Sequence, residues 1–194
     1  MTIRNKPDRA IQPVFLERFS PYSFDPAATV DATDVAAVFE AARWAMSSYN
    51  EQPWRYIVGA RGRSDEVRER ILAVLVEPNR VWATHAPILA LGLYSPQFEH
   101  NGKPNNAAQH DLGAASACLT IEAGARGLMV HQMSGILPDE ARESFALSHT
   151  YIPLTALAIG RTGPNPALPD DYARRDERER TRRPIDESLL LGGF

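Results

Sequence analysis

Hydrogen-bonding side chains crowd the stretch where the chain is first predicted to change from helix to strand. Ser47, Ser48, Asn50 and Gln52 supply hydroxyl and amide groups, which donate and accept hydrogen bonds without carrying charge. Pro53 follows, and proline favours an extended conformation in the residue before it. We therefore predict a polar turn, which either connects two elements only or presents its side chains to a ligand.

Positive charge and further hydroxyl groups lie near the two ends of the chain. Arg18, Phe19, Ser20 and Tyr22 belong to an aromatic-rich segment that prolines keep from forming a helix. Six arginines lie between residues 174 and 183, where nearby acids balance them. We interpret most of this second run as a solvated charged surface rather than a nucleic-acid site.

Hydrophobic periodicity indicates the elements that must position these residues. Val35, Val38, Phe39, Ala42 and Met46 follow helical spacing after an N-cap at Asp31. Further helices are predicted over 15–18, from Ser64 to Pro78, over about 107–126 and from Pro138, with strands at 56–59, 88–94 and 153–160. The continuous apolar run of 88–94 is typical of a strand buried on both faces. An apolar segment, 185–191, closes the chain and is predicted to add a strand, within the chain or to a partner subunit.

Composition limits the classes of protein that the chain can belong to. With 194 residues we predict a single domain, with residues 1–14 as an N-terminal arm and 161–194 as an extended C-terminal segment. The net charge of -3 gives no reason to expect nucleic acid, and no apolar run reaches membrane-spanning length. The single cysteine, Cys118, suits a reducing compartment such as the cytoplasm. The five histidines have no metal-binding spacing, and no glycine-rich nucleotide loop is present.

The stretch Ala-Arg-Trp-Ala-Met-Ser-Ser-Tyr-Asn-Glu-Gln-Pro-Trp-Arg, residues 42–55, resembles the signature of the FMN-dependent nitroreductase family. In that family the matching segment meets the flavin ring, which implies cofactor-binding roles for Ser47, Ser48, Asn50 and Gln52. Met46 departs from the family pattern, which usually has proline there.

Two arginine-containing segments resemble the phosphate-binding parts of the same family. Arg18 and Ser20 match its Arg-x-Ser-x-Arg-x-Phe segment, with Phe19 between them, and an arginine suits phosphate because its planar fork supplies charge and paired donors. Tyr22 stands where the family has a second basic residue, so the positive charge usual near the flavin is missing from this segment. Arg180 and Arg182 resemble the late basic pair that completes the phosphate site.

The third signature lies in residues 128–136. By register, the resemblance implies that Gln132, Met133, Ser134 and Gly135 face flavin N5 and O4 through main-chain N–H groups. A backbone with small side chains can approach a ring closely. His131, inside the same stretch, is more readily explained as structural than as catalytic.

The resemblance implies an α+β fold, with a mostly antiparallel sheet flanked by helices, in an intertwined homodimer with FMN at the subunit interface. It also implies a ping-pong oxidoreductase in which NADH or NADPH reduces the flavin and a nitroaromatic, quinone or related acceptor reoxidises it. The flavin carries the hydride chemistry, so we expect no catalytic side-chain acid or base and no metal. Two alternatives stay open: a flavin-binding storage or sensing protein without turnover, and a family member with other flavin chemistry, such as dehydrogenation, dehalogenation or flavin breakdown.

Overall fold

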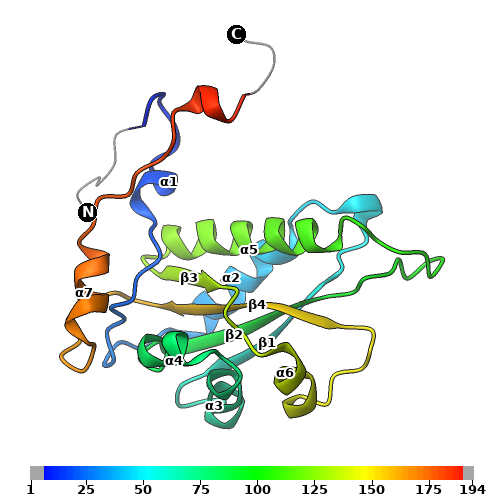
Figure 1. The fold of residues 1–194 in the computed structure, drawn as a ribbon, viewed down its shortest axis with the longest axis horizontal. Helices are drawn as coiled ribbons and strands as arrows, with labels where there is room; N and C mark the ends of the chain where they lie inside the picture. The colour runs from blue at the N-terminus through cyan, green and yellow to red at the C-terminus, as the bar shows by residue number, and fades with distance from the viewer. Residues whose placement is uncertain (1–6, 190–194) are drawn as a thin grey trace.

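A computed structural model describes residues 7–189 of the chain, and its centre is a four-stranded sheet (Figure 1). The strands are β1 (Trp54–Ala60), β2 (Ile88–Tyr94), β3 (Met129–Met133) and β4 (Ile152–Gly160), in the order β1-β2-β4-β3. Each neighbouring pair is antiparallel. The α+β class with an antiparallel sheet is therefore confirmed.

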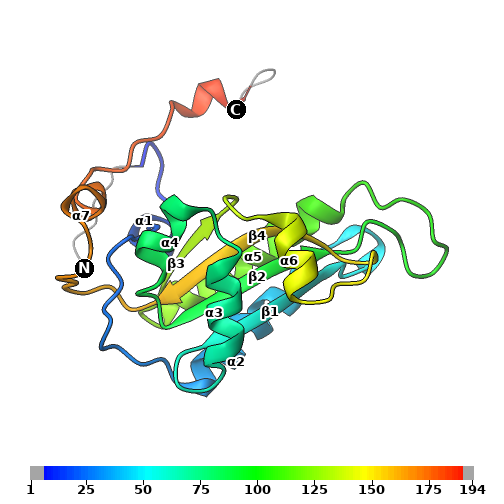
Figure 2. The same cartoon turned by 60° about the horizontal axis from the view of Figure 1, so that its bottom comes forward.

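Helices cover both faces of the sheet (Figures 1 and 2). The pair α2 (Ala32–Arg43) and α5 (Ala108–Ala125) lies on one face. On the other face lie α3 (Asp65–Ala73), α4 (Glu77–Ala83) and α6 (Pro138–Ser144). None of the helices within residues 7–189 has the length and apolar character needed to cross a membrane.

Strand β2 shows why the sequence produces two apolar layers. Successive side chains of a strand point to opposite faces. Ile88 and Ala90 accordingly pack into the cluster beneath α2 and α5, while Leu89 and Leu91 pack into the cluster beneath α3. Every residue of β2 is buried, as the continuous apolar run predicted.

The remaining elements lie outside these layers. They are α1 (Pro13–Glu17), the 3-10 turns η1 (Ser48–Asn50) and η2 (Ile185–Glu187), and α7 (Asp170–Asp176). The chain's two end segments run beside each other along one side of the molecule (Figures 1 and 2). This contact joins α1 to the residues after α7 and creates the cavity described below.

Several sequence predictions about elements were wrong. Pro78 does not end a helix, because α3 stops at Ala73 and Pro78 lies in the first turn of α4. Met46 is not on the apolar face of α2, because that helix ends at Arg43 and Met46 is 71% exposed. In the predicted closing strand, residues 185–187 form a 3-10 turn instead, and residues 190–191 lie outside the described part of the chain.

Candidate functional site

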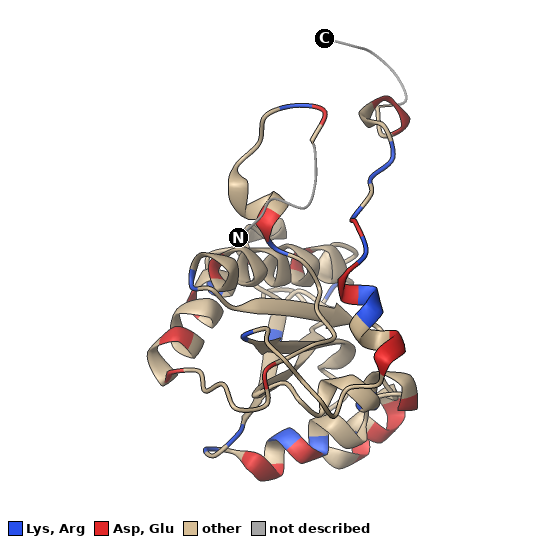
Figure 3. Cartoon of the chain, turned by 90° about the vertical axis from the view of Figure 1, so that its left-hand side faces the viewer, with Lys and Arg blue, Asp and Glu red and all other residues tan. Residues whose placement is uncertain are grey.

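A cavity lined by arginines lies between the two end segments. Its volume is about 480 Å³, and Arg18, Arg180, Arg182 and Arg183 contribute to its walls. Figure 3 shows the charged residues of the C-terminal segment passing beside the N-terminal part of the chain. Burial, and then the positive charge of Arg182, lower the pKa of Arg18. Because like charges held together repel, the cavity favours an anion that would neutralise them.

Arg18 has bonding capacity available for such an anion. One of its terminal nitrogens donates to the Ser20 hydroxyl at 3.2 Å. Its Nε atom is buried and has no hydrogen-bond partner among the described residues. An unpaired buried donor is costly, so an anion that accepts from it would be stabilised. The structure thus places Arg18 and Ser20 together.

Arg180 lines the same cavity but bonds mainly to the backbone. Its guanidinium donates to the carbonyl oxygens of Leu16 at 2.8 Å, of Phe15 at 3.2 Å and of Arg18. These bonds fix the chain at the end of α1. Arg182 is exposed and donates to the neighbouring Thr181 carbonyl at 2.7 Å, which leaves most of its donors available for a ligand.

Tyr22 packs into an aromatic cluster behind the cavity. Its ring meets the rings of His131 and Trp82 edge-on, at centroid distances of 4.8 and 5.2 Å. The main-chain N–H groups of Tyr22 and Ser23 donate to the carboxylate of Asp176, at the end of α7. Sequence reasoning missed Asp176, because no local pattern links residues that lie 154 positions apart.

His131 joins this cluster to the sheet. Its Nδ1 atom lies 2.9 Å from the Pro21 carbonyl oxygen, and its ring stacks on Trp82 at 4.2 Å. Burial lowers the pKa of His131. The neutral ring that burial favours donates its Nδ1 proton to the carbonyl, so His131 positions the segment that contains Ser20 and Tyr22.

The predicted 132–135 segment begins on β3, at the edge of the sheet. Within the described residues β3 pairs with β4 alone, so its other edge leaves main-chain groups outside the ladder. The Gln132 side chain donates to the Ser116 carbonyl and to Thr120 on α5, Met133 is buried, and Ser134 is exposed. Gly135 is closely packed: a Cβ atom there would come within 2.4 Å of the amide nitrogen at the end of the Asn79 side chain, which would have to shift.

The turn containing Ser47, Ser48, Asn50 and Gln52 is held tightly in an unusual conformation. Tyr49, Asn50 and Gln52 all have φ between 51° and 55°, which is costly for residues other than glycine. Two bonds hold the turn: the Ser47 hydroxyl accepts from the Gln52 N–H at 3.0 Å, and the Ser48 N–H donates to Asp111 at 3.1 Å. Backbone strain of this kind typically occurs at ligand-binding segments.

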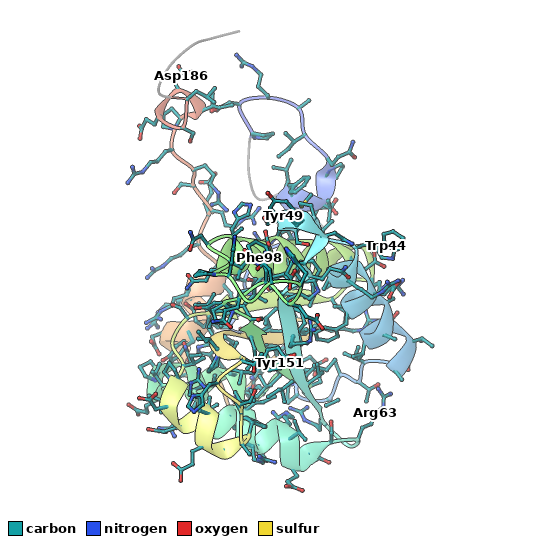
Figure 4. The ribbon with its side chains drawn as sticks, turned by 90° about the vertical axis from the view of Figure 1, so that its right-hand side faces the viewer. Trp44, Tyr49, Arg63, Phe98, Tyr151 and Asp186 are labelled. Atoms are coloured by element: carbon teal, nitrogen blue, oxygen red, sulfur yellow. The ribbon has the colours of Figure 1, made fainter. Side chains whose placement is uncertain are left out.

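Aromatic side chains lie exposed beside this turn (Figure 4). Tyr49 is 86% exposed and meets the ring of Phe98 edge-on at 5.7 Å. Trp44 is 75% exposed on the same side of the fold. Sequence reasoning also missed Asp111, a buried carboxylate directly before the apolar stripe that begins at Leu112, and this position was the available signal.

The two halves of the predicted site lie at opposite ends of α5 within one chain. The turn is bonded to Asp111 in the first turn of α5, whereas Arg18 lies beside Gly124, near its last turn. These two positions are thirteen residues apart along the helix, which corresponds to about 20 Å. The structure therefore places Arg18, which is bonded to Ser20, with Arg180 and Arg182 at the cavity, and it places Tyr22, on the same segment as Phe19, against His131 on β3. Gln132 bonds to Ser116 and Thr120 midway along α5, and Gly135 contacts Asn79. Within a single chain the structure does not bring Ser47, Ser48, Asn50 or Gln52 to Arg18.

A metal site has no support in this region. Among residues 7–189, no group of three or more His, Cys, Asp or Glu side chains could hold a metal ion. Cys118 is a free, half-buried thiol on α5.

Comparison with known proteins identifies the family. A sequence profile described as the nitroreductase family matches residues 16–161. An uncharacterised 15.4 kDa protein of Mycolicibacterium smegmatis is 31% identical over 144 residues, which cover 71% of this chain and 95% of that protein. A Streptomyces coelicolor protein, provisionally named as an NADH dehydrogenase or NAD(P)H nitroreductase, is 27% identical over 154 residues. The match covers 70% of this chain and 76% of that protein.

Solved structures agree with this match. A structure described as an oxidoreductase containing FMN has a TM-score of 0.90 and 28% identity, covering 100% of this chain and 98% of that one. A nitroreductase from Exiguobacterium sibiricum in complex with FMN shares the fold at a TM-score of 0.74 and 17% identity. The match covers 91% of this chain and 94% of that one. The extent of the profile match and the identity to these relatives lead to one conclusion: the chain belongs to the nitroreductase family.

Proposed function

We propose that the chain is an FMN-dependent oxidoreductase that takes reducing equivalents from NADH or NADPH and passes them to nitroaromatic, quinone or related acceptors. The observation that carries this proposal is the cavity lined by Arg18, Arg180 and Arg182, beside which the buried Nε atom of Arg18 has no hydrogen-bond partner among residues 7–189. The FMN named for the structure at 28% identity supports the choice of ligand.

The residues around the cavity fit a phosphate-bearing cofactor. Arg18 and Arg182 offer charged donors, and Ser20 adds a hydroxyl group. Arg180 holds the carbonyl groups of the N-terminal segment, so it would shape the phosphate site by positioning Arg18. This assigns Arg180 a different role from the direct phosphate contact that the resemblance implies.

The rest of the site would come from a second copy of the chain. The turn at residues 47–52 lies about 20 Å from Arg18 along α5, so in a homodimer with α5 helices antiparallel, the partner's turn would approach the Arg18 end. The outer face of α5 supports such a contact, because Gly113 and Ala117 are exposed and permit a close approach. Exposed Trp44 and Met46 would be covered in the same interface.

Bound FMN would supply the hydride chemistry, and the protein would supply position. The main-chain groups at the free edge of β3 would donate hydrogen bonds to the cofactor, with Gly135 kept in place by Asn79 and Val76. The nicotinamide donor and the acceptor would use the same face in turn, in a ping-pong cycle. The exposed ring of Tyr49 belongs to the turn that would line this face, and the half-buried ring of Phe98 packs edge-on against it.

Anaerobic mixing of the FMN-loaded protein with NADH or NADPH tests the proposal. We expect the flavin absorbance near 450 nm to bleach promptly and to return when a quinone or nitroaromatic compound is added. Protein that binds FMN but stays oxidised with both donors would instead favour the second candidate, a flavin-binding protein without turnover. Tyr22 favours that candidate, because a hydroxyl group stands where a basic side chain would assist reduction.

A further inference from the structure

Helix α7 is attached to the proposed cofactor segment by a carboxylate. Asp176 accepts the Tyr22 N–H at 2.9 and 3.0 Å with its two oxygens, and the Ser23 N–H at 2.7 Å. Hydrogen bonds to an ionised acceptor are roughly twice as strong as neutral ones. The end of α7 is therefore fixed against the backbone that follows Ser20.

The residue before Asp176 brings a positive charge to Tyr22. The guanidinium carbon of Arg175 lies 5.5 Å from the centroid of the Tyr22 ring and 4.7 Å from that of Tyr172. Both distances suit a cation–π contact. Arg175 also approaches Asp171 at 3.4 Å, but both side chains are exposed, by 41% and 52%, and such surface pairs are weak. The Asp176 carboxylate is bound to the main-chain N–H groups of Tyr22 and Ser23, whereas the Arg175 guanidinium faces the Tyr22 ring, so a ligand beside that ring would experience the charge of Arg175.

The position of Tyr22 indicates which end of the cofactor is concerned. Tyr22 follows Arg18 by four residues, which an extended chain spans in up to about 13 Å. Its ring packs on His131, directly before Gln132 and the segment expected at the redox edge. Arg18 thus marks the phosphate end of the proposed site, and Tyr22 with Arg175 marks the ring end.

We propose that Arg175 tunes the proposed flavin site by supplying, from α7, a positive charge at the ring end that the segment of residues 18–22 lacks. The inference rests on the proposed function and concerns its redox balance. Two-electron reduction leaves a flavin with a negative charge at neutral pH, so a nearby cation favours the reduced form. Asp176 is the positioning residue that keeps α7, and hence Arg175, beside Tyr22.

The test compares Arg175→Gln and Arg175→Lys with Arg174→Gln, a matched change at an exposed arginine of the same helix. The measurement is the midpoint potential of bound FMN, titrated anaerobically with xanthine and xanthine oxidase against a reference dye. In Arg175→Gln we expect reduced FMN to lose about tenfold in affinity relative to oxidised FMN, which equals about 30 mV for a two-electron couple. Arg175→Lys and Arg174→Gln should stay close to the wild type.

Three results would overturn the inference alone, and a fourth would overturn the proposed function as well. Equal potentials in Arg175→Gln and Arg174→Gln would show that the charge does not reach the ring. A loss of FMN affinity without a loss of riboflavin affinity would place Arg175 at the phosphate. A lower unfolding temperature of the apoprotein with an unchanged potential would show a structural role only. A wild-type protein that fails to bind FMN would overturn the proposed function itself, and the inference with it.

Discussion

At the scale of single residues, Arg18 is half-buried, its Nε atom has no hydrogen-bond partner in the described part of the chain, and a second guanidinium lies nearby. The change Arg18→Gln removes the charge but keeps a polar side chain. We expect FMN binding to weaken by about 1.5–3 kcal/mol, the range for a hydrogen bond to a charged group. Flavin fluorescence during titration of the apoprotein measures this loss directly.

Riboflavin and an arginine elsewhere control this experiment. Riboflavin has no phosphate, so its affinity should change little in Arg18→Gln. Arg63→Gln, an exposed arginine in the turn between β1 and α3, should bind FMN as the wild type does. An unchanged FMN affinity in Arg18→Gln would show that the phosphate is held elsewhere.

His131 gives the protein a predicted pH dependence of stability. Burial lowers the pKa of His131 in the folded chain below the unfolded value of about 6.5. Above that pH the ring is neutral in both states. As the pH falls below it, the unfolded chain binds a proton first, so the free energy of unfolding decreases by up to about 1.4 kcal/mol per pH unit until the folded pKa is reached.

Urea unfolding at pH 7 and pH 5 measures this effect. His131→Gln should remove part of the decrease, while His149→Gln, at an exposed turn position, should keep it. Burial, and then the charges of Arg61 and Arg68, lower the pKa of His85 as well. His85 should therefore account for part of the decrease in the free energy of unfolding that remains in His131→Gln. If the free energy of unfolding fell equally between pH 7 and pH 5 in the wild type and in His131→Gln, this account would be contradicted.

At the scale of elements, α7 is held to the cofactor segment by Asp176. Asp176→Ala removes the acceptor of two main-chain N–H groups and leaves them unpaired. We expect a loss of about 2–4 kcal/mol in the free energy of unfolding, seen as a lower Tm, together with weaker FMN binding. The neighbouring exposed Glu177→Gln is the control, and equal Tm values for the two variants would refute the role of Asp176.

The loop after β3 depends on a glycine for packing against α4. In Gly135→Ala the added methyl group would meet the Asn79 amide at 2.4 Å and a Val76 methyl at 2.8 Å. We expect a loss of about 1–3 kcal/mol, the cost of overpacking. Ser134→Ala, at the exposed neighbouring position, should unfold like the wild type. Gly135→Ala with wild-type stability would mean that Asn79 moves aside freely.

Elements with a strong local pattern were predictable from the sequence. Strand β2 follows from its unbroken apolar run, and α5 follows from its spacing and from Gly127, which takes φ +69° just after the helix. Helix α7 was missed, because five of its seven residues are charged and it packs on the N-terminal segment by long-range contacts. Pro78 was misread because proline is equally common in the first turn of a helix.

For the site as well, some features were predictable from the sequence and others depend on long-range contacts. The resemblance to the family signatures implied that the segment of Arg18, Ser20 and Tyr22 meets the segment at β3, and the structure shows Arg18 bonded to Ser20 and Tyr22 packed against His131 on β3. Arg180 bonds to backbone carbonyl groups near α1, and Asp176 accepts hydrogen bonds from the backbone at Tyr22. Both contacts depend on tertiary geometry, which single-sequence patterns do not encode.

At the scale of the whole molecule, the proposed site is divided between the ends of α5. If a partner chain completes it, a bulky residue on the outer face of α5 should block both assembly and FMN binding. Gly113→Trp makes this change where an added Cβ meets nothing within 4 Å in the single chain, so folding should be kept. Glu140→Trp, at an exposed position of α6, is the matched control.

Sedimentation equilibrium distinguishes the outcomes. We expect a dimer for the wild type and for Glu140→Trp, and a folded monomer without FMN for Gly113→Trp. A Gly113→Trp protein that stays dimeric and binds FMN normally would exclude this face of α5 from the interface.

The most direct measurement for the account as a whole is a fluorescence titration of the wild-type apoprotein with FMN and, in parallel, with riboflavin. Because the arginine cavity is proposed to bind the phosphate, we predict saturation at one FMN per chain and an affinity at least about tenfold above that of riboflavin. An absence of saturable FMN binding, or equal affinities for the two flavins, would contradict the account.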